Sequence, residues 1–192
     1  MDSSTATRTI VDAMTKAIVE HRLHPGTKLA EQKLADHFSV SRTLIRQALF
    51  QLAQKRLIRM EPARGAFVAT PSSDEARQVF SVRRMIEVEM TRSFVRHVTP
   101  AQIKALKDHV AQEKAAVDSG DVPSRTDLLG DFHVRMAELM GNTVLAQILS
   151  ELISRCALIT LMYQSTNAAE HSAEEHAEIL KAIAAKDEDL AV

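Results

Sequence analysis

The sequence holds 192 residues, with 45% hydrophobic and 26% charged side chains, an ordinary soluble globular composition that allows one large domain or two small ones. A single cysteine, Cys156, excludes an internal disulfide, the polar residues 1–5 exclude a secretory core, and the longest apolar run, 156–163, is too short to span a bilayer. The net charge of −1 divides unevenly, because residues 1–71 carry 11 Lys and Arg against 6 Asp and Glu, whereas residues 72–192 carry 13 against 19.

Apolar periodicity and turn residues predict a compact set of elements in the front half. A first helix is expected over 8–22, where Pro25 and Gly26 stop it, because proline cannot continue the hydrogen-bond ladder. Ser41 is placed to cap the third helix, whereas the second lacks a good capping side chain. The remaining expected elements are a helix over 31–38, a helix over 42–55, strands near 57–60 and 66–69 around a turn at 62–65, and a linker at 70–73.

The back half shows only helical periodicity, which predicts an all-α bundle. Thr99, Pro100 and Gln102 form a capping box with proline in the first position, and Gly141 is expected to end a helix in the left-handed conformation. The expected helices span 74–97, 99–120, 123–140, 143–164 and 172–185, and Asp187 is expected to cap a sixth that continues past Val192.

The predicted fold is therefore mainly α, with a winged helix-turn-helix followed by a helical bundle. The predicted domains are 1–70, a winged helix-turn-helix unit, and 74–192, a helical unit, joined by a linker at 71–73.

Two arginines one turn apart indicate a DNA-reading surface in the front half. Arg42 and Arg46 share one face of the third predicted helix, opposite its apolar seam, and Ser41 and Thr43 place hydroxyls near its N-terminus. Arginine that binds guanine through two hydrogen bonds is the commonest specific base contact. A lone surface arginine is usually only solvated, but the spacing, the hairpin and the local positive charge together favour DNA.

The front half resembles the GntR family of transcriptional regulators. The resemblance rests on five segments, 23–31, 34–35, 40–43, 46–49 and 64–68, and covers residues 8–70. It departs from the family pattern at Leu44, Gln47 and Arg56, where proline, glutamate and glycine are usual. The resemblance implies DNA contacts by Gln32, Ser41, Arg42, Thr43, Arg46, Arg64 and Gly65.

The back half resembles the helical FCD effector domain of the FadR subgroup, through segments 82–87, 131–133, 141–142, 175–180 and 182–183. The resemblance implies that Arg83, or Arg84 beside it, faces an effector pocket, and Arg83 could alternatively pair with Glu87 on its own helix.

Members of that subgroup often hold a divalent metal, such as zinc or nickel, through an aspartate and three histidines. His133 and His176 match two of the histidines, but Leu129 occupies the aspartate position. The resemblance thus implies metal and effector binding by His133 and His176, while both could instead be hydrogen-bonded structural histidines.

The preferred hypothesis is a cytoplasmic, homodimeric transcription regulator that binds a double-stranded DNA operator and responds to a small organic acid. It is not expected to be an enzyme or to bind a membrane. The alternatives are a metal-dependent enzyme, with a water activated between His133 and His176, and a helical adaptor that binds protein.

Overall fold

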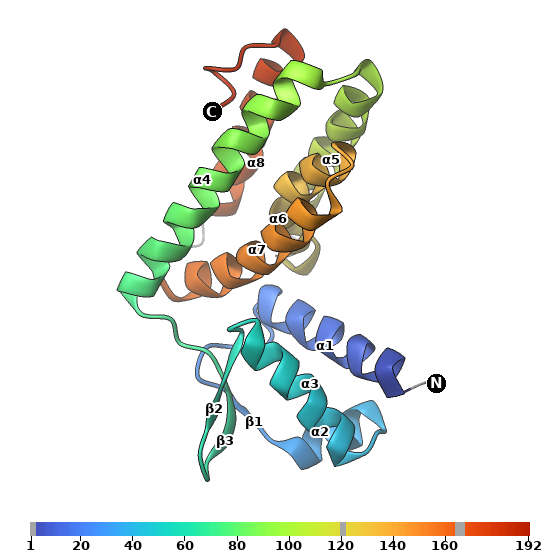
Figure 1. Ribbon diagram of the computed structural model, residues 1–192, viewed down its shortest axis with the longest axis vertical. Helices are drawn as coiled ribbons and strands as arrows, with labels where there is room; N and C mark the ends of the chain where they lie inside the picture. Colours follow the sequence, from blue (N-terminus) through green and yellow to red (C-terminus); the bar gives the residue numbers. More distant parts are fainter. Residues whose placement is uncertain (1–2, 120–121, 164–167) are drawn as a thin grey trace.

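A computed structural model describes residues 3–119, 122–163 and 168–192, and shows two units stacked end to end (Figure 1). The first unit holds three helices and a small sheet, and the second holds five helices. The predicted fold class, mainly α with a winged helix-turn-helix followed by a helical domain, is confirmed. The elements are α1 (Ser3–Val19), β1 (Lys28–Leu29), α2 (Glu31–Phe38), α3 (Arg42–Gln54), β2 (Ile58–Glu61), β3 (Gly65–Val68), α4 (Ser73–His97), α5 (Pro100–Asp118), α6 (Val122–Leu139), α7 (Thr143–Tyr163) and α8 (Ala168–Ala185).

Helix α1 is displaced from the predicted range 8–22 at both ends. It starts earlier because the buried Thr7 occupies the next position of the apolar stripe, one turn before the buried Ile10 and Val11. It stops before Pro25 because His21 adopts a positive φ of 60° and the amides of the next two residues turn back to one helical carbonyl.

The sheet has three strands in the order β1–β3–β2, all antiparallel. The prediction of two strands was incomplete, because β1 contains only two residues and is too short to show any alternation. Leu29 of β1 lies opposite Ala66 of β3, and both are buried. The hairpin between β2 and β3 turns through Ala63 and Gly65, which have φ values of 60° and 98°.

Helices α2 and α3 form the helix-turn-helix. The Ser41 hydroxyl accepts the Leu44 amide at 3.4 Å and caps α3 as predicted, whereas Ala30 offers α2 no side-chain cap. Leu44 is only half-buried. The face of α3 that packs on α1 is formed by fully buried apolar side chains, namely Ile45, Ala48, Leu49 and Leu52.

The second unit confirms most of the predicted helix starts. Thr99 and Gln102 form the expected capping box, and Gly141 has the expected left-handed φ of 74°. The predicted ends at residues 120 and 164 lie outside the described residues.

One prediction near the end of the chain was wrong. Helix α8 starts at Ala168, so Ser172 lies inside it and is not its cap, because the preceding alanines and Glu170 already favour helix. Asp187 accepts the Leu190 amide at 3.0 Å, as the predicted cap should, and its carbonyl accepts the Ala191 amide at 3.1 Å. The continuation of this helix past Val192 stays a prediction.

Helix α7 links the two units. Its Leu158 is fully buried in the apolar core of the first unit, among side chains of α1, α3 and the sheet. On the neighbouring turns, Leu149 and Ile153 belong to the core of the second unit. One helix therefore contributes to both cores, which fixes α1 against the bundle.

By length and apolar composition, α7 is the one helix in the described ranges that could cross a membrane. The apolar run 156–163 is only the C-terminal part of this helix, and by itself it is too short to predict a membrane span. In the structure α7 packs against α1, α4 and α6, as the central helix of a bundle does.

We predict that Leu158→Ala lowers the free energy of unfolding by about 2–5 kcal/mol, because it leaves a cavity in the core shared with α1. Val144→Ala on the same helix serves as the control, since Val144 is 68% exposed and a surface change of this kind shifts stability by about 0.5 kcal/mol or less. Urea unfolding followed by circular dichroism measures both. Equal losses would show that Leu158 does not anchor the first unit.

Candidate functional site

Arg42 and Arg46 lie side by side on the outer face of α3, where the buried seam on the opposite side of the helix places them. Their side chains are 55% and 63% exposed, and both bond to one carboxylate oxygen of Glu31 at the start of α2. The Glu31 Oε2 atom accepts Arg42 Nη2 at 3.1 Å and Arg46 Nε at 2.8 Å. The two guanidinium groups are thus accessible and held together by a single acceptor.

Glu31 remains ionised beside these arginines. Desolvation acts to raise its pKa, but the hydrogen bonds from Arg42 and Arg46 and the attraction of their charges outweigh it, so the pKa of Glu31 is lowered. The group of three side chains therefore carries a net positive charge at neutral pH.

The other predicted contacts of the helix-turn-helix surround this pair. Thr43 is exposed in the first turn of α3, two residues after the cap Ser41. The Gln32 amide donates to Asp36 Oδ1 at 2.8 Å, within its own helix α2. Helix α3 thus presents hydroxyls and guanidinium groups beside its N-terminus on one accessible face.

The hairpin tip carries Arg64 and Gly65 as predicted, with Gly65 open to its surroundings. Arg64 Nη1 lies 2.6 Å from Glu61 Oε2. Three cations gather around the ring of Phe67, since Arg64, Arg59 and Lys28 lie 5.4, 5.7 and 5.9 Å from its centroid. The wing is therefore more basic than Arg64 alone suggested.

A cavity of about 580 Å³ opens between α4, α6, α7 and α8. It contains the three predicted effector residues, Arg83, His133 and His176. Val19, the last residue of α1, also lines it, so the cavity reaches the first unit. This volume is that of a pocket for a small organic molecule.

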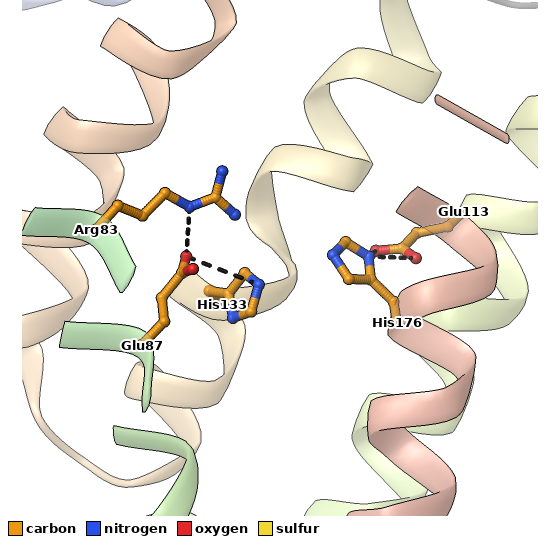
Figure 2. Close-up of polar contacts among 5 residues, drawn as sticks. All are labelled: Arg83, Glu87, Glu113, His133 and His176. Atoms are coloured by element: carbon orange, nitrogen blue, oxygen red, sulfur yellow. Dashed lines mark hydrogen bonds and ion pairs between the residues drawn. The ribbon is translucent and has the colours of Figure 1, made fainter. Parts of the chain in front are cut away.

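Arg83 faces the cavity as part of an ion pair, with its Nε atom 2.6 Å from Glu87 Oε1 one turn along α4 (Figure 2). Arg83 therefore pairs with Glu87 and also lines the cavity, so both alternatives that the sequence offered for Arg83 are present. Burial raises the pKa of Glu87 against the opposing effect of Arg83. Arg84 beside them is exposed and also lines the cavity, so it stays the alternative cation for an effector.

His133 lies on α6 within the cavity and is neutral. Burial, then the charges of Arg83 and His176, hold its pKa well below the ordinary range. Its Nε2 atom is 3.7 Å from Glu87 Oε1, too far for a hydrogen bond. Its buried Nδ1 atom has no hydrogen-bond partner among the described residues. A polar atom left in this way can bond to a bound molecule.

His176 on α8 is held by a buried carboxylate. Its Nδ1 atom donates to Glu113 Oε2 at 3.0 Å, which leaves the other ring nitrogen turned toward His133 (Figure 2). Glu113 is fully buried and also accepts His109 Nε2 at 3.2 Å. Phe132 stacks on the His176 ring at a centroid distance of 4.2 Å. The orientation of His176 is thus fixed from two sides.

The Glu113 network is electrostatically coupled. Desolvation acts to raise the pKa of Glu113, but hydrogen bonds from the two histidines outweigh it and the pKa is lowered. The hydrogen bond to Glu113 raises the pKa of His109, against desolvation. The ionised carboxylate of Glu113 therefore favours protonation of His109, and protonated His109 favours ionisation of Glu113.

The predicted metal site is incomplete in the described residues. The rings of His133 and His176 lie 5.5 Å apart and nearly perpendicular, and a carboxylate behind a histidine is typical of metal ligands. However, no group of three or more His, Cys, Asp or Glu side chains is placed to hold a metal ion anywhere in the described ranges. The side chain of Leu129 lies outside the described residues. Two imidazoles are fewer than the three or four ligands of known zinc sites.

Sequence reasoning missed the carboxylates that organise both sites. Glu31 and Glu113 lie 11 and 63 positions from partners they bind, so no local spacing reveals those contacts. Two signals could have found Glu113, namely its place on the apolar face of its helix and the position of His109 one turn before it.

Comparison with known sequences yields two domain matches. The sequence profile of the FCD domain matches residues 78–192, and that of the bacterial regulatory proteins of the gntR family matches residues 6–68. The HTH-type transcriptional repressor RspR of Escherichia coli is 25% identical over 173 residues, which cover 90% of this chain and 76% of the relative. The HTH-type transcriptional regulator LutR of Bacillus subtilis is 24% identical over 186 residues, which cover 85% of this chain and 84% of the relative.

Solved structures share the fold at lower identity. Escherichia coli McbR/YncC superposes with a TM-score of 0.82 at 19% identity, covering 97% of this chain and 89% of that chain. A putative GntR transcriptional regulator from Rhodococcus sp. RHA1 gives a TM-score of 0.84 at 20% identity, covering 97% and 90%. These structures support the fold and the arrangement of its two units.

We predict that Glu113→Gln destabilises the protein most between about pH 4.5 and 6.5, the ordinary pKa values of glutamate and histidine. The pKa of Glu113 is lowered in the folded state, so its ionisation stabilises the fold at pH values above the pKa of the unfolded chain. This stabilisation is lost as the pH falls through the pKa of the folded state. The pKa of His109 is raised in the folded state, so its protonation stabilises the fold at pH values below the pKa of the unfolded chain. This stabilisation is lost as the pH rises through the pKa of the folded state. Both contributions are therefore present between the two ordinary pKa values.

Urea unfolding of the wild type and the variant across pH 4–9 measures the difference. Glu138→Gln on α6 is the matched control, since its side chain is 50% exposed. If the Glu113→Gln difference were independent of pH, the buried charges would not be coupled to the fold.

Proposed function

Because the chain belongs to the gntR family of bacterial regulatory proteins and carries an FCD domain, we propose that it is a cytoplasmic regulator whose operator binding responds to a small organic acid. The family consists of DNA-binding transcriptional regulators and not of enzymes. The helix-turn-helix supplies DNA binding, and the helical domain implies a small ligand. The metal-dependent enzyme and the protein-binding adaptor are therefore set aside.

The observation that carries this proposal is the pair of exposed guanidinium groups of Arg42 and Arg46 on the outer face of α3. An α-helix fits the major groove of DNA, and an arginine on such a helix can bind guanine through two hydrogen bonds. In the same proposal Ser41, Thr43, Gln32 and the wing residues Arg64 and Gly65 contact phosphates or flanking bases. Two copies of the chain, as a homodimer, would read half-sites about one DNA turn apart.

We assign the effector to the 580 Å³ cavity, with Arg83 as the cation that binds its carboxylate. Arg83 already holds one carboxylate, that of Glu87, so its geometry suits a second from a ligand. His133 offers an unsatisfied buried nitrogen, and His176 a ring nitrogen that Glu113 does not occupy. A zinc or nickel ion stays a prediction of the resemblance, for which metal analysis of the purified protein is the direct test.

Coupling between effector and DNA follows from shared side chains. Val19 of α1 lines the cavity, and Leu158 of α7 is buried in the core of the first unit, two residues from the cavity residue Cys156. A ligand that shifts α7 or the end of α1 would therefore alter how the helix-turn-helix is held, which is the requirement for allosteric control.

We predict that the double variant Arg42→Ala, Arg46→Ala loses at least about 30-fold in affinity for DNA, since each two-bond base contact contributes about 1–3 kcal/mol. The probe is a duplex that the wild-type protein selects from a random-sequence pool, and binding is measured by fluorescence anisotropy over a salt series. Arg77→Ala, Arg135→Ala is the control, because it removes the same charge from exposed sites in the second unit.

If the control variant lost the same affinity for DNA, the loss would come from the change in net charge and not from contacts of Arg42 and Arg46. A wild-type affinity that did not fall with salt would rule out contacts to DNA phosphates.

We predict that small carboxylic acids raise the thermal unfolding midpoint of the wild type, and that Arg83→Ala abolishes the shift while Arg84→Ala retains it. Binding to the folded state stabilises it by mass action. A panel of mono- and dicarboxylates, guided by mass spectrometry of acids that co-purify with the protein, provides the probes. If the Arg83→Ala variant kept the shift, the carboxylate of the ligand would bind to a cation other than Arg83.

A further inference from the structure

We infer that Glu31 is a positioning residue for base readout, which sets the geometry of Arg42 and Arg46 and so determines sequence specificity. No contact between Glu31 and DNA is involved. The inference rests on the proposed DNA contacts of the two arginines.

The geometry places Glu31 beneath the arginines. Its side chain is 25% exposed, whereas those of Arg42 and Arg46 are 55% and 63% exposed. One oxygen, Oε2, accepts both arginines, although they come from successive turns of α3 and Glu31 comes from α2. The carboxylate therefore joins the two helices of the motif and ties both guanidinium groups to the same point.

The bonds to Glu31 leave the readout donors of Arg46 free. Arg46 uses Nε, so both of its terminal nitrogens remain available for the two parallel hydrogen bonds that guanine accepts. Arg42 uses one terminal nitrogen, Nη2, and keeps its other two nitrogens. Each guanidinium can therefore bond to Glu31 and to a base at the same time.

Holding the arginines in place reduces the entropy cost of binding. A free arginine side chain loses up to about 2 kcal/mol of rotamer freedom when it is fixed. Arg42 and Arg46 are held by Glu31 before DNA binds, so they lose less rotamer entropy on binding. This advantage exists only for DNA that fits the orientation in which Glu31 holds them. Pre-organisation therefore favours DNA sequences whose base edges match that orientation over all others.

The same carboxylate opposes non-specific binding. Binding to any duplex depends mainly on attraction between cations and phosphates. A negative charge between the two arginines weakens that attraction equally for every sequence. Loss of the charge should therefore raise affinity for unmatched DNA while loss of the geometry lowers affinity for matched DNA. Opposite changes distinguish positioning from a simple effect of charge.

The test compares Glu31→Gln with the wild type on two duplexes, one selected by the wild-type protein from a random pool and one with the same bases scrambled. We expect affinity for the selected duplex to fall about tenfold or more, and affinity for the scrambled duplex to stay equal or rise about two- to threefold. Asp12→Asn on α1 is the matched control, since Asp12 is 66% exposed and loses the same charge away from the arginines. Circular dichroism melting verifies that each variant is folded.

Three outcomes would overturn the inference. Affinity could rise for both duplexes, which would make Glu31 a repulsive charge only. It could fall equally for both duplexes at an unchanged melting temperature, or Asp12→Asn could reproduce the loss of selectivity. The double variant of Arg42 and Arg46 separates this inference from the function on which it rests. If that variant keeps its affinity for the selected duplex, the arginine contacts themselves are wrong, whereas failure of Glu31→Gln alone leaves them intact.

Discussion

The burial of one face of α3 is the constraint on which the DNA-binding surface depends. Ile45, Ala48, Leu49 and Leu52 are fully buried, so the helix can pack in only one rotation about its axis. That rotation leaves the arginines four positions apart on the opposite side, in solvent. The apolar seam therefore decides where the charges point, and the charges contribute little to the fold because exposed ion pairs stabilise weakly.

In and behind the cavity of the second unit several charges are buried or half-buried, and each requires a compensating partner. Glu113 is enclosed with His109 and His176, and Glu87 is paired with Arg83. An unpaired buried charge would cost several kcal/mol, so these pairs keep the cavity polar at a tolerable cost. The two units therefore use carboxylates differently, since Glu31 orients exposed cations and Glu113 stabilises a buried network.

The sequence predicts long periodic elements and strong caps well. The α3 seam, the Ser41 cap and the capping box of α5 follow from local patterns, and their structure agrees. It fails where tertiary contacts decide, as for β1, which exists only because β3 pairs with it, and for the end of α1, where the chain turns at His21.

The candidate sites divide in the same way. The positions of Arg42, Arg46 and Arg83 could be predicted because helical spacing fixes the face on which they lie. The carboxylates Glu31, which bonds to Arg42 and Arg46, and Glu113, which bonds to His176, could not be assigned these partners, because packing between helices brings them together. The roles of all these residues in binding remain proposals for experiment.

The solitary thiol of Cys156 has a practical value that follows from its location. It is 3% exposed and lines the cavity, and burial raises its pKa, so it is protonated and shielded at neutral pH. An alkylating reagent can reach it only through the cavity or when the helices around it separate. Since the sequence has no second cysteine to compete for the reagent, the rate at which Cys156 is alkylated measures how often its surroundings open.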